Sequence, residues 1–172
     1  MTETVAYEIT GQIGEIEFRK YPHMVLATVG SQGNDSGFNL LFSYITGNNT
    51  TKRQIPMTAP VITSAQIPMT SPVLSDEQSM SFVMPGGKEI DEMPDPLDHR
   101  VKITSLPQRE IAVIRFKGYA GHEDVHEITS RLREGLKKSG IATRGQPVLM
   151  RYNAPWTPGF LRRNEVGIEI TR

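Results

Sequence analysis

The stretch YNAPWTPGFLRRNEVGIEIT, residues 152–171, places an aromatic loop in front of a segment with near-perfect alternation. Two prolines stiffen the loop because they fix φ and lower the entropy of the unfolded chain. We therefore expect Trp156 and Phe160 to be held in place beside Arg162 and Arg163. The segment after the loop predicts a half-buried strand, since apolar and polar residues alternate along it. One face holds Val166, Ile168 and Ile170, and the other holds Glu165, Gly167, Glu169 and Thr171.

Two interpretations of this loop are open. Aromatic rings on a stiff loop beside two guanidiniums suit a flat, partly anionic ligand. Alternatively, the rings cap the core and the arginines pair with Glu165 or Glu169. The chemistry of the residues favours neither interpretation over the other.

Length and composition limit the possible functions. A chain of 172 residues suits one domain with a real core. Lys+Arg and Asp+Glu both number 19, so no net field attracts nucleic acid or an anionic membrane. The absence of cysteine excludes disulfides, thiolate catalysis and covalent haem attachment. No apolar run approaches ~20 residues, and residues 1–8 lack a signal-peptide pattern. We expect a soluble, cytoplasmic protein without a membrane span.

The first half predicts strands followed by a short helix. Strands are indicated at 5–10, 14–20 and 24–29. Ser36 or Asp35 then caps a helix that runs to about Thr46 and stops at Gly47. A helix of about eleven residues is marginal alone, so it must pack on a sheet. Its apolar face consists of Phe38, Leu41, Phe42 and Ile45.

A local duplication follows the helix. Residues 54–61, QIPMTAPV, return as QIPMTSPV at 66–73. Proline removes ladder donors, so both copies are expected at sheet edges or in extended crossing segments. Met57 and Met69 could touch a soft ligand, but thioethers more often fill gaps in a core, which we favour for at least one. A further strand is predicted at 79–84.

The second half repeats the order of the first. After a connection at 89–100, strands are predicted at 101–104 and 110–119 and a helix at 122–139. Two more strands finish the chain. The order strands, helix, strands thus occurs twice, which predicts one α+β domain over 1–172 with an internal pseudo-twofold.

One catalytic motif is present. Residues 122–126, HEDVH, satisfy H-E-x-x-H, which puts two imidazoles on one helix face with a glutamate as base. Thr129 stands where the extended pattern needs glycine, and a catalytic zinc needs three protein ligands. We expect a solvated helix start and no peptidase activity. Since no G-x-S-x-G elbow is present either, no catalytic residue is assigned.

Four segments, in order over nearly the whole chain, resemble the SOUL haem-binding protein family: residues 15–21, 38–49, 57–61 and 162–166. The resemblance implies two βαβ-type repeats that form a twisted, barrel-like antiparallel or mixed sheet flanked by two helices. It also implies a relation to small-molecule effector-binding domains of some bacterial regulators. The implied function is non-covalent binding of haem or another tetrapyrrole in an apolar cleft, with no chemistry assigned.

The chain departs from the family where haem is contacted. In one branch of the family a histidine, proposed as the axial ligand, stands where this chain has Lys20. In another branch, lysines thought to meet the propionates stand where Ser43 and Thr157 occur here. His23 is the nearest substitute metal ligand, although a histidine in a surface turn is the simpler interpretation.

The expected ligand site joins the first helix to the C-terminal loop, with haem as a non-covalent cofactor. Other hypotheses are a binding domain for another flat or amphipathic small molecule, or a hydrolase that acts on one. A hydrolase would need a buried carboxylate in the cleft, and enzymatic activity is not our first expectation. The site residues are Phe38, Leu41, Phe42, Ile45, Met57, Trp156 and Phe160 as walls and Arg162 and Arg163 as cations.

Overall fold

The computed structural model describes residues 3–30, 34–64, 79–153 and 156–172. The chain forms two compact units. The first unit comprises described residues within 1–5, 23–63 and 75–108, and the second those within 6–22, 64–74 and 109–172. Both units combine antiparallel strands with one helix, so the predicted α+β class is confirmed.

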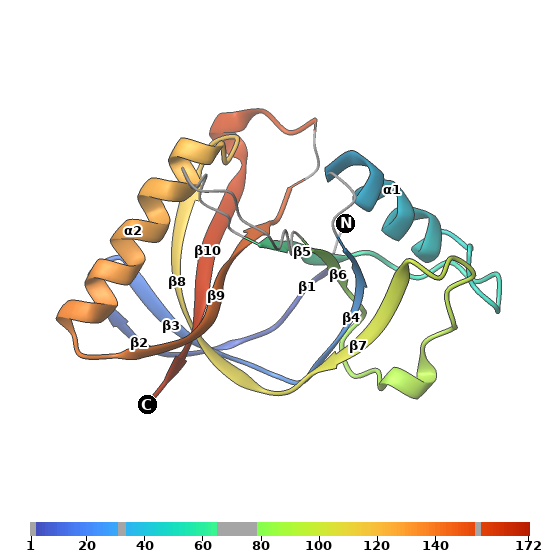
Figure 1. Ribbon diagram of the computed structural model, residues 1–172, viewed down its shortest axis with the longest axis horizontal. Helices are drawn as coiled ribbons and strands as arrows, with labels where there is room; N and C mark the ends of the chain where they lie inside the picture. The colour runs from blue at the N-terminus through green and yellow to red at the C-terminus, as the bar shows by residue number, and fades with distance from the viewer. Residues whose placement is uncertain (1–2, 31–33, 65–78, 154–155) are drawn as a thin grey trace. The chain divides into compact units, whose positions relative to one another are not determined.

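The second unit is an antiparallel sheet covered on one face by a helix (Figure 1). Helix α2, His122–Lys138, packs on β8, β10 and β9. The sheet order is β2-β3-β8-β10-β9. The strands are β2 (Glu8–Ile13), β3 (Ile16–Tyr21), β8 (Arg109–Lys117), β9 (Ala142–Arg151) and β10 (Arg163–Thr171).

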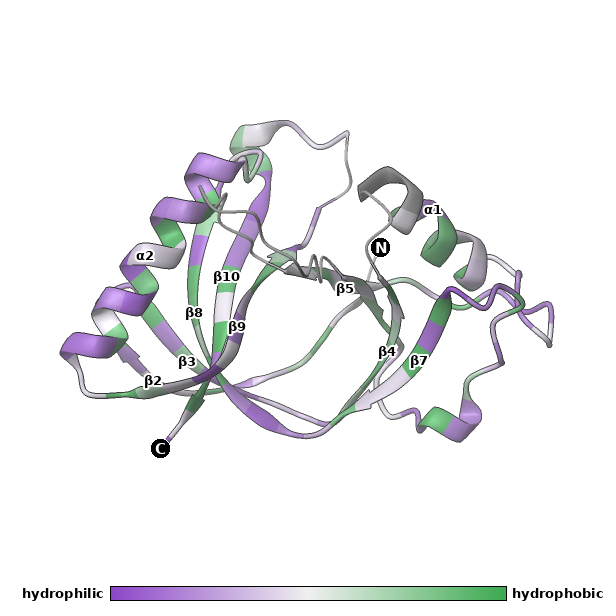
Figure 2. Cartoon of the chain, viewed as in Figure 1, coloured by the Kyte–Doolittle hydropathy of each residue, from purple (hydrophilic) through white to green (hydrophobic). Residues whose placement is uncertain are grey.

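Alternation decides which face of this sheet meets α2. The apolar residues of β10 join the apolar stripe of the helix in one core, as the sequence predicted. Hydropathy follows the same pattern along β8, β10 and α2 (Figure 2). This core contains Ile16, Phe18, Ala112, Ile114, Val125, Ile128, Leu132, Leu136, Leu149, Val166, Ile168 and Ile170.

The first unit has a second antiparallel sheet and helix α1, Asn34–Ile45. The helix contacts β4, β6 and β7, and its Leu41, Tyr44 and Ile45 are buried. The sheet order is β5-β6-β4-β7, and the short strand β1 (Glu3–Thr4) pairs with β5 in parallel. The strands are β4 (Met24–Val29), β5 (Thr58–Ser64), β6 (Met80–Val83) and β7 (Val101–Leu106), and a 3-10 turn, η1, covers Ile90–Glu92.

Several sequence predictions need correction. The predicted caps Asp35 and Ser36 are wrong, because α1 already begins at Asn34. The strand expected at 5–10 lies further along the chain, as β2, and residues 5–7 connect it to β1. Its position is set by pairing with β3 in a hairpin that turns at Gly14, where φ is positive. The edge position expected for the first proline copy is wrong over Thr58–Ala59, where β5 has partners on both sides. Pro60 is tolerated because it lies where the β5–β6 register shifts and no ladder bond is needed.

Other expectations remain open or are only partly met. The copy at 66–73 lies outside the described residues. Neither unit closes its own sheet into a barrel in the described part of the chain, since β2 and β7 each pair with one neighbour there. The pseudo-twofold and the single domain stay predictions. No helix among the described residues is both long and apolar enough to cross a bilayer.

Candidate functional site

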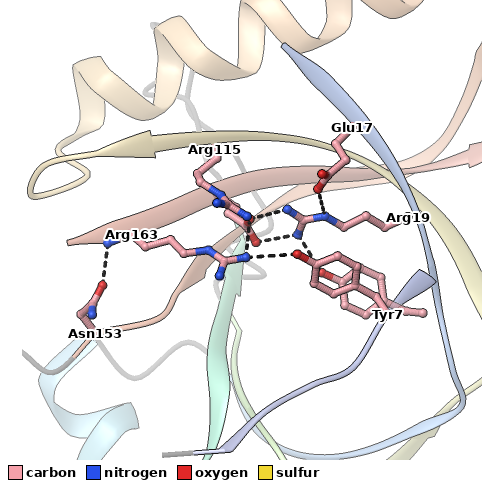
Figure 3. A network of polar contacts seen from close by, with 8 residues as sticks. Tyr7, Glu17, Arg19, Arg115, Asn153 and Arg163 are labelled. Atoms are coloured by element: carbon pink, nitrogen blue, oxygen red, sulfur yellow. Dashed lines mark hydrogen bonds and ion pairs between the residues drawn. The ribbon is translucent and has the colours of Figure 1, made fainter. Parts of the chain in front are cut away.

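A polar network lies on the face of the second unit's sheet that points away from α2. The strand β10 sends Val166 and Ile168 toward the helix, so Arg163 and Glu165 project to the opposite face. From β3, Glu17, Arg19 and Tyr21 project to this same face, since Ile16 and Phe18 belong to the core under α2. Strand parity therefore gathers these charges and hydroxyls (Figure 3).

A buried ion pair is the centre of this network. Arg19 donates from Nη1 to Glu165 Oε1 over 2.8 Å and from Nη2 to Glu165 Oε2 over 2.6 Å. Both side chains are fully buried. Such a two-point pairing of guanidinium and carboxylate satisfies both groups where water cannot reach them.

Two further guanidiniums contact the same carboxylate. Arg163 donates from Nη2 to Glu165 Oε2 over 3.1 Å and to the Tyr7 hydroxyl over 3.3 Å. Arg115 Nε lies 3.5 Å from Glu165 Oε2, with much of its side chain exposed. The second carboxylate in the network, Glu17, accepts from Arg19 Nε (Figure 3). With three arginines and two glutamates, the network has a net charge of +1.

These contacts fix the charge states of the pair. Burial opposes ionisation of Glu165, but its hydrogen bonds to Arg19 and the nearby positive charges outweigh burial and lower its pKa. Burial likewise disfavours the charged form of Arg19, and the hydrogen bonds and charge of Glu165 reverse the effect and raise the pKa of Arg19. Glu165 is therefore a carboxylate that holds arginines, not a proton donor.

Tyrosine rings pack around the arginines. The Arg19 guanidinium lies over the Tyr7 ring at 4.1 Å, and that of Arg163 lies over the Tyr152 ring at 4.2 Å. Burial, followed by the charge of Glu165, raises the pKa of the Tyr152 hydroxyl, and burial also raises the pKa of Tyr21. Both phenols are therefore neutral at ordinary pH.

The C-terminal loop is held against the turn that follows β8. A 3-10 turn, η2, covers Gly159–Leu161. Gly118 N donates to Gly159 O over 3.1 Å, and a Cβ at Gly159 would lie 2.4 Å from the Tyr119 ring, so only glycine fits there unless the ring moves. Arg162 donates from Nε to Thr157 O over 2.7 Å and lies over the Tyr119 ring at 4.6 Å.

This geometry tests both parts of the second interpretation of the loop, the pairing of the arginines and the capping of the core. The pairing of Arg163 with Glu165 is confirmed. The capping of the core by the loop aromatics is wrong, because Trp156 and Phe160 are exposed. Trp156 and Phe160 are therefore exposed on a segment that the Arg162–Thr157 hydrogen bond spans.

The predicted site residues of the first unit are mostly core residues. Leu41 and Ile45 are buried, and Phe38 and Met57 are partly buried against the same core. Phe42 is 46% exposed and stacks on Phe38 with ring centroids 5.9 Å apart. A single cleft lined by these residues and the C-terminal loop stays a prediction, since the two sets belong to different units.

The remaining candidates lie at the surface. His23 is exposed and its Nε2 shares a hydrogen bond of 2.6 Å with Ser105 Oγ. His122 and His126 are exposed, which confirms the solvated helix start. Within the part of the chain that the structure describes, no three His, Asp or Glu side chains form a group that could hold a metal ion.

A pocket of about 670 Å³ lies in the first unit, and none of the predicted site residues lines it. It is lined by residues 90–96 with Thr50, Thr51 and the start of β7. The Tyr44 hydroxyl donates to Pro94 O over 2.7 Å. Burial and then Asp95 raise the pKa of Tyr44 to about 12.

A family model described as SOUL heme-binding protein matches residues 2–169. The chain belongs to the SOUL haem-binding protein family. The resemblance seen in its segments is thereby confirmed over almost the whole length. A search of curated proteins finds no match.

Solved structures similar to this SOUL protein share its fold. An uncharacterized conserved protein from Listeria innocua is 10% identical with a TM-score of 0.65, over 91% of this chain and 92% of that one. A hydrolase from Listeria innocua is 8% identical with a TM-score of 0.58, over 94% of each chain. SAV2435 bound to tetraphenylphosphonium is 11% identical with a TM-score of 0.53, over 92% of this chain and 94% of that one. At such identities the likeness shows the fold alone.

Sequence reasoning missed the network around Glu165 in this SOUL protein. The alternation of Glu17, Arg19 and Tyr21 was a usable signal, because three polar residues on one strand face need partners. The partner could not be found locally. Strand β8 lies between β3 and β10, and Arg19 and Glu165 are 146 residues apart in the chain.

Proposed function

We propose that the protein binds haem or a related tetrapyrrole non-covalently, with aromatic side chains against the ring and guanidiniums near its carboxylates. The observation that carries this proposal is the loop in which exposed Trp156 and Phe160 flank a segment tied to Arg162. Flat apolar rings and a cation match a planar ligand that carries carboxylates. Membership of the SOUL family supports the same ligand class.

The residues suit the porphyrin ring better than its iron. His23 is an exposed surface residue bonded to Ser105. Tyr21 and Tyr152 are held neutral by raised pKa values, which disfavours tyrosinate ligation. When bound, haem would supply an iron centre, and the chain would supply apolar contact and charge. We therefore propose weak, mainly apolar binding without a histidine on iron.

The charge of the network favours an anionic ligand over a cationic one. SAV2435 holds tetraphenylphosphonium, an organic cation. A carboxylate attracts an organic cation only if neighbouring cations do not already neutralise its charge. The charge of Glu165 is neutralised by Arg19, Arg163 and Arg115. The same neutralisation argues against Glu165 as the general base of a hydrolase.

Hemin titration tests the proposal. We expect a broad, weakly shifted Soret band and quenching of Trp156, the single tryptophan of the chain. Trp156→Ala should weaken binding about tenfold, the effect of removing one aromatic anchor worth about 1.4 kcal/mol. Arg162→Gln should weaken binding of carboxylate porphyrins more than that of their esters.

Two controls separate this site from its alternatives. Leu97→Ala removes an exposed apolar side chain in the first unit and should leave hemin binding unchanged. His23→Ala should also leave it unchanged. If His23→Ala abolishes the Soret band, an axial histidine holds the haem and the proposal is wrong. Absence of any spectral change would move the function to another amphipathic ligand.

A further inference from the structure

Exposed apolar side chains gather around the C-terminal loop. Of the large apolar and aromatic side chains in the described residues, the four most exposed are all found here. They are Trp156 at 86%, Phe160 at 73%, Tyr119 at 66% and Leu161 at 60%. We call this set the aromatic patch. A cluster of this kind marks an interaction surface, because single exposed residues are normally scattered.

The aromatic patch is built on a held backbone. Tyr119 packs on Gly159, which precedes Phe160 and Leu161, and the Gly118 N to Gly159 O bond joins the two segments. The Arg162–Thr157 bond then joins the residues on either side of η2. Insertion of these side chains into a partner therefore costs little ordering of the chain.

Positive charge surrounds the aromatic patch. Lys117 and Arg163 are paired across β8 and β10, and Arg115 and Lys117 are exposed, four and two residues before Tyr119. From residue 141 to 164 the sequence holds four arginines and no acidic residue. Glu165 is buried against Arg19. The exposed acids Glu123 and Asp124 belong to the first turn of α2, four and five residues after Tyr119.

We propose that the aromatic patch docks the protein on the surface of an anionic lipid bilayer, with the rings and Leu161 at the headgroup–acyl boundary. Tryptophan and other apolar side chains beside basic residues suit that boundary, and each nearby cation adds attraction to anionic headgroups. A second copy of the chain fits less well, since a twofold contact would oppose Lys117, Arg162 and Arg163 to their own kind. Because the net charge of the chain is zero, the attraction to the membrane is local to the aromatic patch. Membrane docking is a function separate from tetrapyrrole binding.

The single tryptophan allows a direct test with ligand-free protein. Phosphatidylcholine vesicles with phosphatidylserine should shift Trp156 emission to the blue, and brominated acyl chains should quench it. Vesicles of phosphatidylcholine alone should bind several-fold less protein, and added salt should weaken binding to the anionic vesicles. Because no hemin is present, failure of tetrapyrrole binding leaves this result unaffected.

Matched variants locate the contact. Leu161→Ala should weaken vesicle binding about fivefold to tenfold, because buried methylene groups supply the apolar part of the affinity. Leu97→Ala should not, although Leu97 is 58% exposed and thus nearly as accessible as Leu161. Lys117→Gln should weaken binding to anionic vesicles about fivefold, and exposed Lys88→Gln should leave it unchanged.

Three results would overturn the proposal. The first is no emission shift with anionic vesicles. The second is equal loss with Leu97→Ala and Leu161→Ala, which would show unspecific adsorption. The third is that Leu161→Ala and Lys117→Gln leave vesicle binding unchanged but weaken dimerisation or the binding of a single-stranded oligonucleotide. That result would assign the aromatic patch to another partner.

Discussion

Glu165 shows at the residue scale why a charged side chain can be buried in a small protein. It accepts two hydrogen bonds from Arg19 and one from Arg163, and Arg115 adds a longer ion pair. Removing one member of a buried pair leaves the other charge uncompensated, and this lowers the free energy of unfolding by more than the intact pair contributes to it. This asymmetry predicts unequal effects within one network.

We expect Glu165→Gln to lower the free energy of unfolding by about 3–5 kcal/mol, because it removes the buried carboxylate that pairs with Arg19 at two points and leaves Arg19 only the partly exposed Glu17. Arg115→Ala is the control within the same network and should cost at most ~1 kcal/mol, since Arg115 is half-exposed. Urea denaturation measures both. Equal costs would show that the carboxylate is not the centre of the network.

The lowered pKa of Glu165 predicts acid sensitivity. A carboxyl with a folded pKa below its unfolded value of 4.5 stabilises the fold above that value, and the contribution is lost as the pH falls through the folded pKa. Stability should therefore decline below about pH 4.5. Glu165→Gln should flatten this decline in pH-dependent denaturation curves. A variant with an unchanged slope would place the acid sensitivity in other carboxyls.

At the element scale, Asn49 closes the turn after α1. Its side chain is buried and donates to Tyr44 O and Arg53 O, each over 2.9 Å, and its Oδ1 accepts from Thr51 and from Arg53 N. Gly47, with φ of 132°, begins this turn. Gly47 and Asn49, which belong to one of the segments that resemble the SOUL family, thus stabilise the turn after α1.

Asn49→Ala should therefore lower the free energy of unfolding by about 2–4 kcal/mol, because one buried and several partly buried hydrogen bonds to the backbone are lost. Thermal and chemical denaturation measure the loss. The neighbouring Asn48→Ala removes a similar side chain outside this set of bonds and should cost under ~0.5 kcal/mol. A similar loss in both variants would contradict the role given to Asn49.

The elements that could be predicted are those defined by local periodicity. Helix α2 and strand β10 were predicted from spacing alone, since every third or fourth residue of α2 and every second residue of β10 enters the core. Strand β5 could not be placed, because its partners are distant in sequence and a register shift accommodates Pro60. Ladder partners of this kind are not encoded within one window of the chain.

In the candidate site too, only features set by residues close together in the sequence could be predicted. A stiff C-terminal loop is predicted from its prolines, but exposure of Trp156 and burial of Leu41 depend on what packs beside them. The pairing of Arg163 with Glu165 lies two residues apart on one strand and could be proposed from sequence. The pairing of Arg19 with Glu165 spans three strands and could not.

At the scale of the whole molecule, the net charge is zero but the charges are unevenly distributed. Nineteen basic and nineteen acidic residues cancel, yet Arg115, Lys117 and Arg163 share one face of the second unit's sheet and lie within four residues of the aromatic patch in the chain. Long-range attraction to polyanions is therefore absent, while attraction within a Debye length of about 10 Å is retained. Contact through the aromatic patch should be short-ranged and reversible.

The two proposals meet at Trp156, and together they predict competition. A ring stacked on Trp156 and Phe160 covers the side chains that would enter the bilayer, so hemin and anionic vesicles should weaken each other's binding. By linkage, hemin must weaken vesicle binding by the same factor as vesicles weaken hemin binding, about tenfold if both ligands need Trp156. Sedimentation of protein with vesicles at rising hemin concentration measures one factor, with vesicle-only samples correcting for partitioned hemin. Hemin titration at fixed vesicle concentration measures the other. Independent binding would show that the haem lies elsewhere, since one set of exposed rings cannot contact two partners at once.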